Sequence, residues 1–216
     1  MGPMSERGLW LDPAHRDDLA AFAERARGVD EAAVVRLRER PGGLVAAWVS
    51  TGFDVLASRT VGGRLRPADL SVAADALLAG LAAMTPDGYV DPGFAMDSAW
   101  RGALPPEAGF VHLDDVPARE VFALAQRGTA LAREHTGGHG PPTSLLDQDV
   151  VEVASGEQRV GVPMRCVFAL TAMGFVPDGA GDDEVVRVRT TATWLRVDAR
   201  FGTVYRRRGD PAVVLH

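Results

Sequence analysis

One glycine- and proline-rich segment of the chain carries the residue types best suited to chemistry. Four side chains at its ends and within it could bind a metal ion, namely His135, His139, Asp147 and Asp149. Imidazoles and carboxylates are the ligands that Zn²⁺, Mn²⁺ and Fe²⁺ take in proteins, and His112 or Glu134 could complete the set. One hypothesis is therefore a divalent metal held by this segment, serving a metal-dependent hydrolase.

The spacing of these residues matches no established metal motif. The zinc-protease motif needs two histidines one turn apart on a continuing helix, with a glutamate between them. Here Thr-Gly-Gly separates His135 from His139, and Glu134 precedes the pair. His135 also has a structural explanation, because a histidine in the last turn of a helix bonds free carbonyls and interacts favourably with the helix dipole. We therefore expect no cofactor, with the divalent metal as the alternative.

A second set of candidate ligand-binding residues lies near the end of the sequence. Residues 185–216 hold seven arginines against two acids, and the predicted strands there carry Arg187, Arg189 and Arg196. The planar guanidinium suits phosphate and carboxylate ligands, so an anion or nucleic-acid site is one interpretation. The other is a solvated sheet face whose arginines pair with acids of the same molecule or of a second copy. This second interpretation is favoured, because residues 116–184 carry five arginines against ten acids.

The composition removes several classes of enzyme. Among its 216 residues the chain has no lysine, asparagine or isoleucine, which indicates a very GC-rich bacterial genome. Without lysine there is no phosphate-binding P-loop lysine and no Schiff-base lysine, and without asparagine there is no kinase catalytic-loop asparagine. The net charge of −6 argues against a general nucleic-acid binder, since such binding depends on neutralising phosphates. No apolar run approaches the roughly 20 residues that span a bilayer, so no membrane partner is expected.

Patterns typical of a nucleophile are missing as well. The one cysteine, Cys166, cannot form an internal disulfide, so a reducing cytoplasm is the expected location. Cys166 lies in an apolar run, where buried packing is more common than a nucleophilic role. No serine stands in the Gly-x-Ser-x-Gly pattern of the nucleophile elbow. These observations favour a protein without catalytic activity of its own.

The first half of the chain predicts helices around a β-hairpin. Asp12 before Pro13 predicts a helix start, and apolar residues at helical spacing continue to Gly28. The segments predicted after it are a short helix over 30–40, strands over 44–50 and 53–61, and a helix from Pro67 to Leu81.

The second half predicts the strongest helix in the chain, from a cap at Asp114 or Asp115 to His135, with Pro117 in its first turn. The segments predicted after it are a strand over 159–172, a long strand from 184 with a β-bulge near Trp194, and a last strand through Val204.

The whole pattern predicts an α+β fold, with N-terminal helices and a β-hairpin, then a long helix packed on a C-terminal antiparallel sheet. We place a subdomain boundary in the proline-rich stretch near 105, giving 1–105 and 106–216, or else one continuous domain. The leading functional prediction is a non-catalytic cytoplasmic protein that acts by protein–protein or small-ligand binding, with an unidentified protein or a second copy as partner. The metal hydrolase and the arginine-based anion site are the alternatives.

Overall fold

The computed structural model describes residues 7–135, 141–156 and 158–209, with the backbone alone for His135. The chain divides into two compact units. The first takes Met1–Gly52 and Ser58–Ala103, and the second takes Phe53–Ala57 and Leu104–His216. A short stretch of five residues is thus part of the second unit, although its sequence neighbours on both sides are part of the first.

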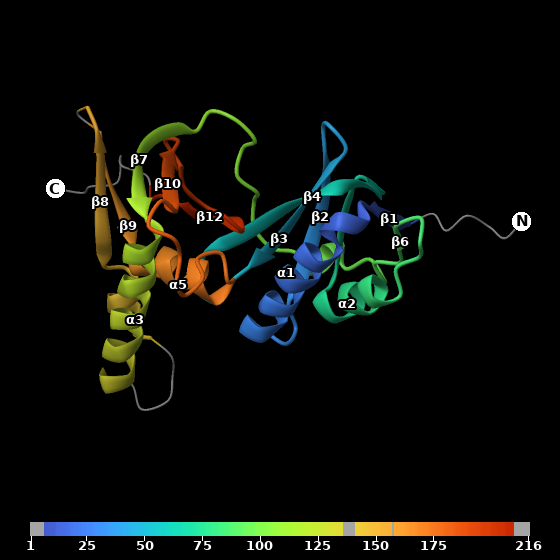
Figure 1. The fold of residues 1–216 in the computed structure, drawn as a ribbon, viewed down its shortest axis with the longest axis horizontal. Coiled ribbons are helices and arrows are strands. Elements are labelled where there is room, and N and C mark those ends of the chain that lie inside the picture. Colours follow the sequence, from blue (N-terminus) through green and yellow to red (C-terminus); the bar gives the residue numbers. More distant parts are fainter. Residues whose placement is uncertain (1–6, 136–140, 157, 210–216) are drawn as a thin grey trace, which may run out of the picture. The chain divides into compact units, whose positions relative to one another are not determined.

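The first unit is an antiparallel sheet with two helices packed against each other (Figure 1). Its elements are β1 (Gly8–Leu11), α1 (Arg16–Val29), β2 (Val34–Arg40), β3 (Leu44–Ser50), β4 (Leu56–Arg66), β5 (Asp69–Ala73), α2 (Ala74–Ala82) and β6 (Tyr89–Val90), with 3-10 turns at Pro13–His15 and Asp97–Ala99. The strands follow the order β5-β2-β3-β4, and β1 pairs with both β4 and β6. The first strand of the unit therefore has a partner on each edge.

Helix α1 forms where the sequence predicts it. Four residues on one face of the helix are buried, namely Leu19, Phe22, Ala23 and Ala26. Their spacing of three and four residues is that of an amphipathic helix. The Asp12 carboxylate accepts a hydrogen bond of 3.0 Å from the backbone N–H of Ala14, which caps the 3-10 turn before the helix. The helix continues to Val29, so Gly28 lies within its last turn instead of ending it.

The short helix predicted over 30–40 is wrong, because the end of this segment forms strand β2. Val35 and Leu37 are fully buried on either side of Arg36, which is the two-residue period of a strand. β2 pairs with β3 on one edge and with β5 on the other. These pairings join residues far apart in the sequence, and the local spacing of Val34 and Leu37 does not report them.

The helix predicted from Pro67 begins later, at Ala74. The residues before it form β5, which pairs with β2, and Leu70 is buried in that strand. The Asp69 carboxylate accepts two hydrogen bonds of 2.7 Å from Arg36 on β2. This cross-strand ion pair stabilises the extended conformation of β5. The apolar spacing predicts instead that the same residues form the first turn of the helix.

The second unit also combines an antiparallel sheet with two packed helices (Figure 1). Its elements are β7 (Val111–Pro117), α3 (Ala118–His135), α4 (Thr143–Leu146), β8 (Asp149–Ser155), β9 (Gln158–Pro163), α5 (Met164–Ala172), β10 (Val185–Thr190), β11 (Trp194–Ala199) and β12 (Gly202–Arg207). The sheet order is β12-β11-β10-β7, and β8 pairs with β9 in a separate hairpin. The predicted α+β class, with a long helix and a C-terminal antiparallel sheet, is confirmed.

The strongest predicted helix starts after the acids that were expected to cap it. Asp114 and Asp115 lie on strand β7 and pair with β10, and α3 begins at Ala118. The backbone N–H of Ala118 donates to the carbonyl oxygen of Glu184 (2.8 Å), just before β10. The first turn of α3 is therefore tied to the neighbouring strand, and the capping role predicted for the two acids is wrong.

The strand predicted over 159–172 is two elements, the strand β9 and the helix α5. Pro163 precedes the helix at its N-cap, and every residue from Met164 to Leu170 is buried. A helix that is buried on all sides has no polar face, so its period cannot be read from apolar spacing. The alternation in the strand simply runs on into the helix.

The β-bulge predicted near Trp194 is instead a turn between the strands β10 and β11. The hydroxyl oxygen of Thr191 accepts hydrogen bonds from the N–H groups of Thr193 (3.3 Å) and Trp194 (3.0 Å). Each strand then keeps its own alternation, which explains the change of apolar phase. The last strand, through Val204, is confirmed as β12.

Gly80 and Gly28 offer a matched test of packing, since both are helical glycines. A Cβ at Gly80 in α2 would lie 1.9 Å from the carbonyl oxygen of Asp91, whereas one at Gly28 in α1 would meet nothing within 4 Å. We expect Gly80→Ala to lower the free energy of unfolding by about 3 kcal/mol, because backbone must move. Gly28→Ala should raise it by about 0.5–1 kcal/mol through helix propensity. Urea denaturation measures both, and equal effects would contradict the contact at Gly80.

Candidate functional site

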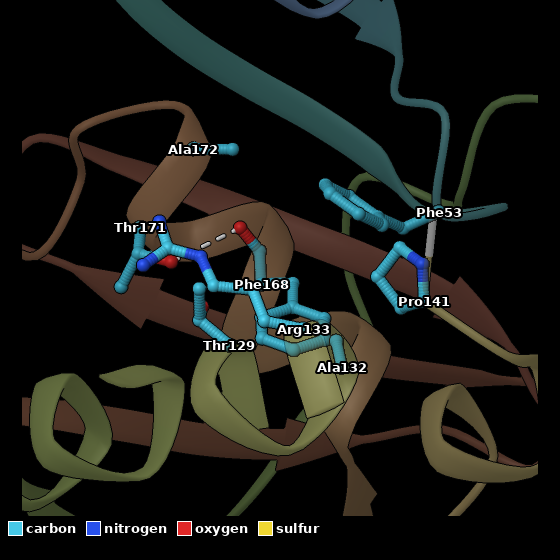
Figure 2. A pocket seen from close by; sticks show the side chains of 8 residues that line it. All are labelled: Phe53, Thr129, Ala132, Arg133, Pro141, Phe168, Thr171 and Ala172. Carbon is cyan, nitrogen blue, oxygen red and sulfur yellow. Dashed lines mark hydrogen bonds between the residues drawn. The ribbon is translucent and has the colours of Figure 1, made fainter. Parts of the chain in front are cut away.

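The second unit contains a cavity of about 500 Å³ between the helices α3 and α5, shown in Figure 2. The apolar residues that line it are Phe53, Ala132, Pro141, Phe168 and Ala172. The polar ones are Thr129 and Arg133 from α3 and Thr171 from α5. In Figure 2 Phe53 and Pro141 lie on one side of the cavity, and Thr171 and Ala172 on the other. A mostly apolar wall with a few polar groups is typical of ligand-binding cavities.

A glycine on α3 leaves room for two side chains of α5 beside this cavity. A Cβ at Gly128 of α3 would lie 2.8 Å from Met164 and 2.9 Å from Phe168, both on α5. A larger residue would therefore have to displace the ends of the Met164 and Phe168 side chains. Thr129 and Ala132 follow on the same helix and line the cavity. The missing side chain thus lets the Phe168 ring sit against α3 and form part of the cavity wall.

Phe53 reaches the cavity because a buried arginine holds its backbone. Arg165 on α5 is 7% exposed and donates a hydrogen bond of 2.7 Å to the carbonyl oxygen of Phe53. The ring of Phe53 then packs on Phe168, with the ring centroids 5.8 Å apart. Arg165 also lies 3.8 Å from the carboxylate of Asp54. One side chain therefore fixes the segment that closes one side of the cavity.

The main partner of Arg165 is Asp147, which follows the short helix α4. The guanidinium donates two hydrogen bonds to the same oxygen of Asp147, the one from Nε measuring 3.1 Å. Arg206 of β12 donates a third, at 3.3 Å. Both arginines direct their hydrogen bonds to one carboxylate oxygen, so Asp147 acts here as a structural counter-ion.

A smaller hollow of about 260 Å³ lies in the first unit and differs in character. Its wall includes Arg36 and Asp69, which bond to each other, and Ser71, whose N–H donates to Asp97 (2.7 Å). The hydrogen bonds that Arg36 donates to Asp69 raise the pKa of the Arg36 guanidinium. Because these polar groups satisfy one another, the cavity of the second unit is the candidate site.

The side chains of only two of the four predicted metal ligands, Asp147 and Asp149, are described by the structure. His139 lies outside the described residues, and His135 is the last residue of α3 with only its backbone described. Asp147 is engaged by arginines, and the carboxylate of Asp149 lies against Gly161, where a Cβ would come within 2.1 Å of it. In the described part of the chain no three His, Cys, Asp or Glu residues could together hold a metal ion. The metal site stays a prediction.

The three arginines predicted to bind an anion all lie near acids of the same unit. Arg189 donates to Asp198 at 2.7 Å, and Arg196 donates to the other oxygen of Asp198 at 2.8 Å. Arg187 lies 3.9 Å from the carboxylate of Asp115. Arg196 also stacks over Tyr205, 5.6 Å from its ring centroid. These contacts agree with the intramolecular interpretation of the arginine-rich strands, and a ligand role for them stays a prediction.

Cys166 lies in α5, next to Arg165, and is completely buried. Burial raises the pKa of its thiol to about 12. The thiolate is the reactive form of cysteine, and at neutral pH this side chain holds almost none of it. Cys166 therefore contributes to the packing of the buried core of the second unit.

The residues that build the candidate site were not singled out by sequence reasoning. One feature of the sequence could have identified Arg165 as a buried charge. It is the one charged residue between Val160 and Phe175. A lone charge in an apolar run requires a buried partner, although nothing in the run says which. Phe53 and Arg133 have no such feature, since an aromatic residue before a strand and an arginine on a helix are both ordinary.

Two family models match the chain, one for each half. Residues 4–102 match a domain of unknown function (DUF8010), and residues 105–211 match a second domain of unknown function (DUF8185). No curated protein matches the chain in sequence.

Solved structures of bacterial sliding clamps are similar to the chain in fold. A DnaN sliding clamp (DNA polymerase III subunit beta) from Bartonella birtlesii, bound to griselimycin, has a TM-score of 0.57 at 15% identity, covering 94% of this chain and 65% of that one. The pol III beta from Caulobacter crescentus has a TM-score of 0.57 at 11% identity, covering 95% of this chain and 66% of that one. A sliding clamp from Pseudomonas aeruginosa has a TM-score of 0.55 at 12% identity, covering 97% of this chain and 68% of that one. The chain thus spans about two thirds of the clamps' length, and the likeness shows a shared fold.

In the part of the chain that the structure describes, no helix is both long enough and apolar enough to cross a membrane.

Substitution of Arg165 tests its role in holding the cavity wall. Arg165→Met should lower the free energy of unfolding by about 3 kcal/mol, because the Phe53 carbonyl loses this donor and Asp147 loses two of its three arginine hydrogen bonds. The matched control is Arg206→Met, since Arg206 is 30% exposed and contacts the same Asp147 at 3.3 Å. Its effect should stay below about 1 kcal/mol. Chemical denaturation measures both, and a control as damaging as Arg165→Met would refute the role of Arg165.

The buried thiol gives a second test, by chemical labelling and by pH. Ellman's reagent should leave native Cys166 unmodified and should react with it at once in urea. Because burial raises the thiol pKa to about 12, only the unfolded chain ionises between about pH 8.5 and 12. Stability should therefore be full below that window and fall as the pH rises through it. Cys166→Ala should lack this part of the fall, and rapid labelling of the native protein would show the burial to be wrong.

Proposed function

We propose that the chain is a non-catalytic binding protein that associates with copies of itself and acts through contact with other proteins. The observation that carries this proposal is the likeness to sliding clamps, which extends over 94% of the chain. Those relatives are named as a subunit of DNA polymerase III, so they work within an assembly. A shared fold does not by itself imply a shared function, so the proposed contacts are inferred from the exposed residues of this chain.

The first unit presents a small apolar patch, made of Phe94 and Met96. Phe94 is 83% exposed and Met96 is 37% exposed. The patch is anchored, because the N–H of Met96 donates to the carbonyl oxygen of Ser71 on β5 (2.7 Å). Asp97 accepts a hydrogen bond from the N–H of the same serine. Burying one phenylalanine is worth about 1.5–3 kcal/mol, so a second copy that covers Phe94 gains stability from it.

The edge strand β7 of the second unit is protected against pairing with another strand. The Asp114 carboxylate accepts a hydrogen bond from the N–H of Asp115 (2.8 Å), which leaves that donor unavailable to a neighbouring chain. Pro117 has no N–H, and the pairing of β7 with β10 shifts register near Val188. Acids, a proline and a bulge are the usual protection of an edge strand. Self-association is therefore proposed through side chains of the Phe94 patch and not through β7.

Nucleic acid is not part of the proposal. The net charge is −6, and Arg189 and Arg196 are paired with Asp198. Binding to DNA depends on cations that are free to replace the counter-ions of phosphates. Because these two arginines are paired with Asp198, they would add less to the free energy of DNA binding than unpaired arginines would.

Light scattering coupled to size exclusion tests the self-association directly. The chain has a mass of 22.9 kDa, and we expect a particle of two or more copies that dissociates on dilution. Phe94→Ser should shift this equilibrium toward the monomer by about tenfold or more. Leu44→Ser is the matched control, because Leu44 is also exposed (39%) but lies at the start of β3.

Two outcomes would count against the proposal. A single copy at every concentration would remove the self-association altogether. An assembly that Phe94→Ser and Leu44→Ser leave equally intact would show that the Phe94 patch is not the contact.

A further inference from the structure

We propose that the cavity between α3 and α5 binds a small apolar carboxylate, such as a medium-chain acid, with its carboxylate on Arg133. This inference goes beyond the proposed self-association and does not depend on it. Its basis is the juxtaposition of an apolar cavity with one guanidinium that has no partner among the described residues.

The size and lining of the cavity suit a small molecule. Its volume of about 500 Å³ falls within the range of roughly 300–1,000 Å³ that small-molecule sites occupy. The rings of Phe53 and Phe168, together with Ala172, supply apolar surface for a chain or a ring. An apolar body in this cavity is removed from water, which is the main source of affinity at such sites.

The hydroxyl groups of the cavity have already used their protons. Thr129 donates to the carbonyl oxygen of Ala125 (2.8 Å), and Thr171 lies within donating distance of Val167 (3.1 Å) and Phe168 (3.2 Å). These are bonds to the preceding helical turn. Donors for the polar end of a ligand therefore have to come from Arg133.

Arg133 is the charged residue of the cavity wall, and its surroundings differ from those of Arg165 on α5. The guanidinium of Arg165 is buried and surrounded by acceptors. No described hydrogen bond or ion pair engages Arg133, and in Figure 2 its side chain extends from α3 toward the α5 side of the cavity. A guanidinium without a protein partner next to apolar surface favours an acceptor with a negative charge.

The charge balance favours a carboxylate over a phosphate. One guanidinium matches one carboxylate with two parallel hydrogen bonds. A phosphate monoester at neutral pH carries close to two charges and would bring an unpaired charge against the apolar wall, which is unfavourable. The wall is also held in place before any ligand binds, because Arg165 bonds to the backbone of Phe53 and the Phe53 ring packs on Phe168. Such preorganisation lowers the loss of conformational freedom on binding.

Isothermal titration calorimetry of the full chain with octanoate, octan-1-ol and octyltrimethylammonium tests the proposal. We expect octanoate to bind at least about tenfold more tightly than the alcohol, because only octanoate has a negative charge to pair with the guanidinium, and the cation to bind least. Arg133→Gln should weaken octanoate by about tenfold and leave octan-1-ol within about twofold. Ala172→Leu, which narrows the cavity, should weaken both.

Arg127→Gln is the matched control, since Arg127 is also an exposed arginine on α3 but does not line the cavity. It should bind octanoate as the unmodified chain does. Equal affinity for octanoate and octan-1-ol, an equal loss in the two arginine variants, or no octanoate binding at all would each overturn the proposal. Phe94→Ser should leave octanoate binding unchanged, so this test and the self-association test succeed or fail separately. Circular dichroism confirms that each variant is folded.

Discussion

A charge that is removed from water needs acceptors close by, and the second unit is organised around one such charge. The Arg165 guanidinium is 7% exposed and is satisfied by Asp147 and by the carbonyl oxygen of Phe53. Those partners lie 18 and 112 residues away in the sequence. The cost of leaving the charge unpaired therefore ties α5 to the segment before β8 and to the stretch Phe53–Ala57. The shape of the cavity depends on this connection, because it places the Phe53 ring.

Electrostatic pairing within the chain also determines which cations can meet a ligand. The chain has only arginine as a strong cation, and the strands that are richest in it keep Arg189 and Arg196 on Asp198. Arg36 is bound by Asp69 in the same way in the first unit. Against this background an arginine that lines an apolar cavity and has no described partner is distinct. Position relative to acids, and not the number of arginines, directs attention to Arg133.

The likeness to sliding clamps concerns the fold of the chain, and the proposed association rests on the surface that this chain itself presents. Each unit packs two helices together beside antiparallel strands, and the clamps share this fold at 11–15% identity. Packing constraints conserve a fold far beyond recognisable sequence, whereas surface contacts change freely. The contacts proposed for this chain are therefore drawn from its own exposed residues, above all Phe94, and from its own cavity.

Sequence periodicity by itself determined the α+β class, the burial of Cys166, helix α1, and the body of α3 with its end at His135. In the two helices one face of a local segment is apolar, and around Cys166 the whole local run is apolar, so this information lies within the segment itself. Tertiary structure decided the rest. β2 and β5 are strands because they pair with each other, α5 is a helix buried on all sides, and Asp114 lies on a strand that pairs with β10. The cavity joins Phe53, Arg133 and Phe168 from three separate segments. Apolar spacing shows which side of an element is buried, but only the folded chain determines what that side meets.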